Sequence, residues 1–142
     1  MNFRSGDMMP VLRARSDGLW ELAENWRIQT SLGLIYVKKG FVTDGASVPR
    51  MAWFLAGHPM ESPRVLAALA HDWLYAAHVC TREEADAVYR EILLRYRAAW
   101  RVWVEYEALR IFGEAAWQKP QDEIDFARAH GALVRVQERK TK

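Results

Sequence analysis

The sequence has very little cysteine and little net charge, and each shortage excludes certain kinds of binding site. Cys80 is the only cysteine among 142 residues, which excludes an internal disulfide and a thiolate-rich zinc site and is typical of a chain that folds in a reducing compartment. The formal net charge is only +2, so there is no domain-wide positive field of the kind that binds nucleic acid. We therefore expect a protein that binds no nucleic acid.

Long apolar runs are missing as well. Residues 1–18 contain arginines but no apolar run of the length of a signal peptide, and no stretch of the sequence could span a bilayer. We expect neither a signal peptide nor a transmembrane segment. Hydrophobic residues nevertheless make up 51% of the chain and aromatic residues 12%, which is enough to build a core. The length is that of one domain, which we expect to span residues 1–142.

The N-terminal third of the chain has the pattern of a small antiparallel sheet. Within residues 19–43, short aromatic and β-branched runs alternate with turn signals at 24–25, 31–33 and 38–40, which predicts two or three strands. Residues 1–18 have no clear period and would form a loose arm or an edge strand. In residues 44–61, Asp44-Gly45, Ser47 and Pro49 predict a loop that leads into a short helix ending at Gly57.

Three helices are predicted in residues 62–113. Ser62 and Pro63 fit an N-cap and a first helical position, and this helix would run to His78. Thr81 and Glu84 fit a capping box that begins a second helix. Because the connection between these two helices is very short, they must run antiparallel.

The third predicted helix spans residues 99–112 and ends before Gly113. Its apolar positions, which we expect to face the core as those of the second helix do, are Trp100, Trp103, Val104, Ala108 and Phe112. Residues 121–142 form a tail with a short helix to His130 and a strand within 132–137. The fold class is therefore α+β, with a small N-terminal antiparallel sheet packed against a bundle of about three helices.

Two ionisable residues interrupt the apolar pattern of the first helix at "HDWLY", residues 71–75. His71 and Asp72 both have apolar neighbours one turn away, and Asp86 lies near the start of the second helix. Since the two helices are antiparallel, Asp86 can meet His71. A carboxylate on one imidazole nitrogen leaves the other nitrogen to take a proton from water, as a general base does.

Asp72 would then point elsewhere, toward a hard cation such as calcium held together with the Asp44-Gly45 loop. The alternative is purely structural. A buried histidine bonded to an aspartate is often a satisfied polar cluster that fixes helix packing, and Asp72 would in that case pair with Arg82 or Arg50.

The successive segments "GFVTDGASVPR", "AALAHDWLY", "TREEADAVY" and "ALRIFG" resemble the motifs of the phage and prophage family called domain of unknown function 1353. The resemblance covers about residues 20–117. It implies a phage or prophage origin, and it brings no settled activity.

The segment "HDWLY" followed by "AD" is also similar to the helix pair of secretory and parvoviral phospholipases, whose pattern is His-Asp-x-x-Tyr and then Asp. This similarity implies His71 as the base that activates water, Asp72 as a calcium ligand, Tyr75 as a supporting tyrosine and Asp86 as the carboxylate that orients the base. Calcium would polarise the ester carbonyl. The glycine-rich calcium loop of those enzymes is absent, so that "TDGASVP", with Asp44 and Gly45, would replace it.

The leading hypothesis is a phage-encoded, metal-assisted hydrolase of phospholipase-like type that acts on a lipid ester at a membrane surface, or on another ester or amide bond. The alternative is a non-catalytic virion or tail accessory protein, in which the polar cluster locks loop to helices and the partners are other phage structural proteins. A third hypothesis is an inhibitor of a host defence protein. In each case the chain would be made in the host cytoplasm, and it would enter the virion if it is a virion component.

Overall fold

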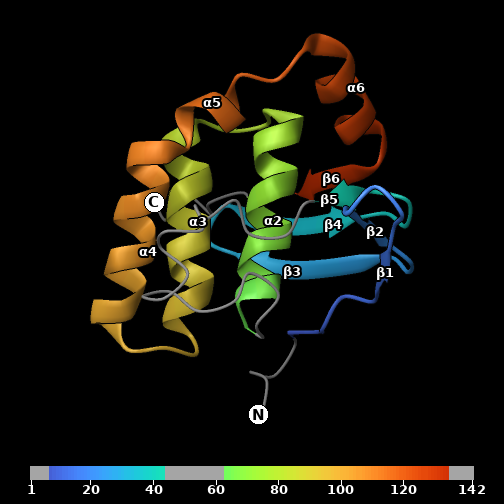
Figure 1. The fold of residues 1–142 in the computed structure, drawn as a ribbon. Helices are drawn as coiled ribbons and strands as arrows, with labels where there is room; N and C mark the ends of the chain where they lie inside the picture. Colours follow the sequence, from blue (N-terminus) through green and yellow to red (C-terminus); the bar gives the residue numbers. More distant parts are fainter. Residues whose placement is uncertain (1–6, 44–62, 135–142) are drawn as a thin grey trace, which may run out of the picture.

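The computed structural model describes residues 7–43 and 63–134, which form antiparallel sheets followed by helices (Figure 1). The fold class is α+β, as the sequence predicts. The elements are β1 (Leu12–Ala14), β2 (Trp20–Leu22), β3 (Trp26–Thr30), β4 (Gly33–Val37), β5 (Val42–Thr43), α2 (Arg64–Ala77), α3 (Arg82–Leu94), α4 (Ala99–Phe112), α5 (Glu114–Trp117), α6 (Gln121–Ala129) and β6 (Gly131–Val134).

The strands form two small antiparallel sheets, with strand orders β1-β2-β5 and β3-β4-β6. The turns between β2 and β5 lie where the sequence places them, although residues 19–43 contain four strands and not two or three. β1 is an edge strand that pairs with β2. Of the two predictions for residues 1–18, a loose arm or an edge strand, the second therefore holds for residues 12–14. β6 comes from the predicted tail strand and pairs with β4, Val37 opposite Gly131, so the N-terminal sheet is completed by the C-terminal region.

The central helix is α2, and every one of its residues except Asp72 is buried. A helix that is apolar on all sides must be covered on all sides, and in Figure 1 α2 lies between α3 on one side and the strands and α6 on the other. Pro63 occupies the N-cap position and not the first helical position, so α2 begins one residue later than predicted. The predicted capping box of Thr81 and Glu84 at the start of α3 is confirmed.

α4 has the predicted bounds, but the prediction of its buried face was wrong. Its buried residues are Val102, Glu105 and Leu109, whereas Trp100 and Trp103 are largely exposed. Because α4 carries apolar side chains on more than one face, periodicity alone did not determine which face packs on α3.

Glu105 can lie on the core face because two arginines compensate its charge. Arg64 at the start of α2 donates from Nε to Glu105 Oε1 at 2.6 Å, and Arg97 Nη1 lies 3.3 Å from Oε2. All three side chains are buried or nearly so. A buried carboxylate is stable only when it is paired in this way, so the cluster fixes the position of α4 against α2.

Candidate active site

The site is built where α2 and α3 lie side by side. His78 ends α2 in the left-handed conformation, φ 51° and ψ 43°, and Thr81 caps α3, so the chain reverses within a few residues. This reversal places His71 opposite Asp86, and the predicted hydrogen bond between them is present: His71 Nε2 lies 2.7 Å from Asp86 Oδ1. The Asp86 side chain is fully buried, and 7% of the His71 side chain is exposed.

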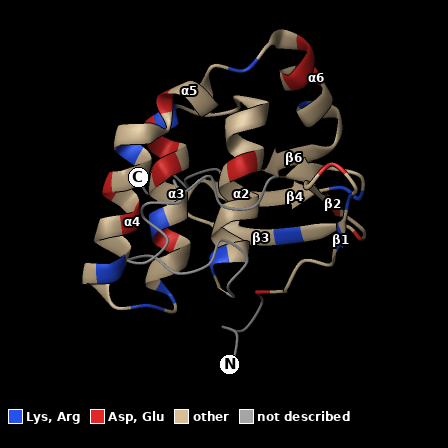
Figure 2. Ribbon diagram, in the orientation of Figure 1, with Lys and Arg blue, Asp and Glu red and all other residues tan. Residues whose placement is uncertain are grey.

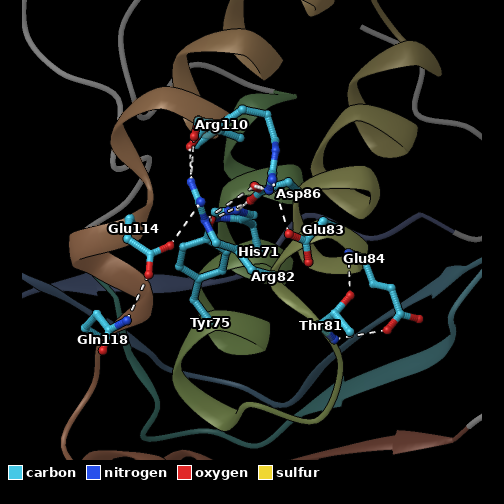
Figure 3. Close-up of polar contacts among 11 residues, drawn as sticks. His71, Tyr75, Thr81, Arg82, Glu83, Glu84, Asp86, Arg110, Glu114 and Gln118 are labelled. Carbon is cyan, nitrogen blue, oxygen red and sulfur yellow. Dashed lines mark hydrogen bonds and ion pairs between the residues drawn. The ribbon is translucent and has the colours of Figure 1, made fainter.

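Tyr75 lies one turn after His71 on α2 and reaches the same carboxylate (Figure 3). Its hydroxyl donates to Asp86 Oδ1 at 2.6 Å, and its ring lies against the imidazole with centroids 4.1 Å apart. His71, Tyr75 and Asp86, which the sequence singled out together, are therefore in mutual contact. No described residue hydrogen-bonds to His71 Nδ1, the nitrogen on the other side of the ring.

Two arginines that the sequence reasoning missed complete the network. Arg110 on α4 donates from Nη1 to Asp86 Oδ2 at 2.6 Å. Arg82 donates from Nε to the Tyr75 hydroxyl at 3.1 Å and from Nη2 to the carbonyl oxygens of Leu109 and Arg110. Arg82 therefore binds the end of α4 and not Asp72. Its i, i+4 spacing from Asp86 was a usable signal, whereas no local spacing connects Arg110 to Asp86.

Gly113 leaves space for the side chains of this network because it has no side chain of its own. A Cβ atom built at Gly113 would lie 2.6 Å from the Tyr75 hydroxyl, 2.9 Å from Arg82 Nη2 and 2.5 Å from the carbonyl oxygen of Leu109. These distances are shorter than normal van der Waals contacts, so any side chain here would displace the tyrosine or the arginine. The glycine that ends α4 is also the residue that lets α4 approach the site.

The charges of the site follow from these contacts. Burial alone would raise the pKa of Asp86, but the hydrogen bonds from His71, Tyr75 and Arg110 outweigh it and hold the pKa below its usual value. Burial and the neighbouring Asp86 carboxylate raise the pKa of Tyr75. At neutral pH the centre of the site is thus an ionised carboxylate with a neutral tyrosine donating to it.

Asp72 points away from this network, as predicted. It lies on the wall of a pocket of about 590 Å³ between α2, α6 and the end of β5, whose other lining residues include Leu19, Phe41, Thr43, Glu123 and Phe126. Asp44 and Gly45, the other predicted cation-site residues, lie outside the described residues, directly after Thr43 in sequence. The structure thus brings Asp72 to the segment that precedes them.

Within residues 7–43 and 63–134, no group of three or more histidine, cysteine, aspartate or glutamate side chains is arranged to hold a metal ion. No helix in this part of the chain has the length and apolar composition needed to cross a membrane.

Comparisons with known proteins give a family and one curated relative. The model of a family described as "Protein of unknown function (DUF1353)" matches residues 20–109. A protein of Sinorhizobium fredii (strain NBRC 101917 / NGR234), "Uncharacterized protein y4iH", is 38% identical over 52 residues, which are 37% of this chain and 22% of that protein. The match therefore spans less than a quarter of the relative. No solved structure matches.

Proposed function

The chain belongs to the family of proteins of unknown function DUF1353, and because this family brings no activity, we propose a function from the site itself: a metal-assisted hydrolase of phospholipase-like type. The observation that carries the proposal is the geometry of one carboxylate oxygen. Asp86 Oδ1 accepts from both His71 Nε2 and the Tyr75 hydroxyl. A phage or prophage origin is part of the same proposal.

His71 would act as the general base. An ionised carboxylate only accepts hydrogen bonds, so Nε2 carries the hydrogen between His71 and Asp86, and in the neutral imidazole the lone pair is on Nδ1. Nδ1 would take a proton from water as the oxygen attacks the ester carbonyl. Asp86 would orient the ring and stabilise the imidazolium, and Tyr75 would hold Asp86 in place.

Calcium would be held by Asp72 with Asp44 and the backbone near Gly45. The fit is partial: Asp72 is the one α2 residue that is not buried, and it shares a pocket wall with Thr43, next to Asp44 in sequence. Carboxylate and carbonyl oxygens are the ligands that calcium prefers. When bound, the ion would supply Lewis-acid stabilisation of the developing oxyanion.

A lipid ester is the proposed substrate because the pocket beside Asp72 has an apolar wall. Leu19, Phe41 and Phe126 line it together with Lys119 and acidic residues of α2 and α6, whereas His71 does not. An acyl chain would occupy the pocket with the ester group near Asp72, and the ester would have to reach from there toward His71 Nδ1. Other esters and amides remain alternatives within the same reaction class.

The test combines calcium binding by calorimetry with fatty-acid release from mixed phospholipid vesicles. We expect calcium binding and hydrolysis in the native protein, loss of binding in Asp72→Asn, and loss of hydrolysis with retained binding in His71→Asn. Asp125→Asn is the control, because Asp125 lies on the exposed face of α6, accepts a hydrogen bond from Gln121 and does not line the pocket. Equal hydrolysis by the native protein and His71→Asn would refute the proposal.

A specific observation favours a second candidate, a non-catalytic phage virion or tail accessory protein. Asp86 is saturated by three side chains, and the His71 side chain is 93% covered, as expected of a cluster that only fixes packing. In that case neither calcium binding nor hydrolysis occurs, while His71→Asn and Asp72→Asn only lower the melting temperature.

A further inference from the structure

The outer face of α4 carries an apolar surface that the described fold does not cover. Trp100, Trp103, Ile111 and Phe112 are 68%, 62%, 69% and 58% exposed, although the opposite face of α4 is buried on α3. Figure 1 shows α4 as the outermost helix on its side of the molecule. A helix that is apolar on opposite faces normally has neighbours on both.

The surface is large for a monomer. Three aromatic side chains of roughly 150–250 Å² each, at these exposures, together with Ile111, present on the order of 500 Å² of apolar area. The largest apolar patch of a typical monomer is roughly 300–600 Å² and often functional. A standard protein interface buries about 800 Å² on each partner, so this face supplies more than half of that area before any rim residue is counted.

The positions along α4 have the spacing of a helix–helix seam. Trp100, Val104, Glu107 and Ile111 follow one another at intervals of 4, 3 and 4 residues, the alternation of the a and d positions of a coiled coil. Trp103 borders this row on one side, and Phe112 lies about 100° round the helix from Ile111 at its C-terminal end. The row is a narrow stripe of the kind that packs against one other helix.

The charges on the stripe indicate what that helix is. Glu107 lies in the middle of the row and Arg101 beside it. Neither side chain forms a hydrogen bond or ion pair with another described residue, although the Arg101 charge also acts on Glu105, one turn further along α4. Figure 2 shows both signs of charge along α4. A carboxylate in the centre of the stripe opposes insertion into lipid, where an unpaired charge is costly. A surface that carries both an acid and a base can instead be complementary to itself.

We propose that this face is the interface of a homodimer, in which α4 packs antiparallel on α4 of a second copy about a twofold axis. If Trp100 lies level with Ile111 of the partner subunit, Glu107 comes level with Val104 of the partner subunit and within one turn of Arg101 of the partner subunit. The apolar side chains are then buried and both charges are paired.

The test is sedimentation velocity of the full chain over a wide concentration range. We expect a dimer whose dissociation constant rises at least about tenfold in Ile111→Glu, because one buried isoleucine is lost and a charge is added. Val134→Glu is the matched control, because Val134 is 58% exposed, like Ile111 a largely exposed apolar residue, but lies on β6. The dissociation constant of the Val134→Glu dimer should be unchanged. Circular dichroism confirms that each variant is folded.

A charge exchange tests the antiparallel register. Glu107→Arg and Arg101→Glu should each weaken the dimer, and the double variant should restore it. A native chain that is monomeric at every concentration overturns the proposal, and so does a dimer that Ile111→Glu leaves unchanged. Binding of the monomer to phospholipid vesicles through this face would also overturn it, in favour of a lipid surface.

Discussion

Gly113 is the position at which the site has least room, and its replacement by alanine is the most direct test of the packing described above. The glycine has φ −78° and ψ −15°, a conformation that alanine adopts without strain. Any loss of stability in Gly113→Ala must therefore come from the added methyl group, which would lie 2.6 Å from the Tyr75 hydroxyl and 2.9 Å from Arg82 Nη2.

The expected size follows from what must move. Overpacking by one methyl group in a well-packed region costs about 1–3 kcal/mol. The loss falls at the upper end of this range if Tyr75 gives way, because its hydroxyl then leaves Asp86 and a hydrogen bond to a charged group is worth about 1.5–3 kcal/mol. Urea denaturation followed by tryptophan fluorescence measures the change in the free energy of unfolding.

A double-mutant cycle identifies the clash. Tyr75→Phe removes one of the three atoms that the added methyl group would overlap, the others being Arg82 Nη2 and the Leu109 carbonyl oxygen. It should therefore cost at least about 0.5 kcal/mol less in the Gly113→Ala background than in the native chain. Gly18→Ala is the control: Gly18 has φ +83° and open space around it, so its cost is backbone strain and independent of Tyr75. A change within about 0.5 kcal/mol for Gly113→Ala would refute the reasoning.

Three further results are expected from the same measurement. Asp86→Ala should cost about 3–5 kcal/mol because it leaves the buried His71 and Tyr75 side chains and the partly exposed Arg110 without their acceptor. By contrast, Asp125→Ala on the exposed face of α6 should change stability by less than about 0.5 kcal/mol. Because the pKa of Asp86 is lowered by folding, its contribution to the free energy of unfolding is present above the unfolded pKa of about 3.9 and is lost as the pH falls below it. The difference in the free energy of unfolding between the native chain and Asp86→Asn should therefore shrink in acid. A difference that is constant from neutral pH to pH of about 3 would contradict this assignment. Gly131→Ala should destabilise by at least about 1–3 kcal/mol, since its Cβ would overlap the indole of Trp73, which donates to the Ala127 carbonyl; unchanged unfolding would show that Trp73 is not fixed there.

The contact between His71 and Asp86 could be predicted because it depends only on helix spacing and a short connection. The capping box at Thr81 fixes where α3 begins, and the reversal at His78 then sets which residues of the two helices are level. Arg110 could not be predicted, because its position depends on how a third helix docks on the first two. Such tertiary placement leaves no periodic signal in the sequence.

The wrong face of α4 has a related cause. Periodicity identifies apolar rows, but α4 has two of them, and the row that packs on α3 contains Glu105. A glutamate is normally evidence against burial. Arg64 from α2 and Arg97 from the α3–α4 connection offset part of the cost of burying it, and those side chains meet it only after folding.

The pairing of β6 with β4 has a consequence for how the chain folds during its synthesis. Val37 leaves the ribosome before α2, but its partner Gly131 follows only after helices α2 to α6. Pairings between residues so far apart in sequence are slow to form, because the entropy of closing a long loop is lost before the contact is gained. The nascent chain therefore carries β4 with an unpaired edge until α6 and β6 emerge, and during that time the edge is exposed to pairing with other chains.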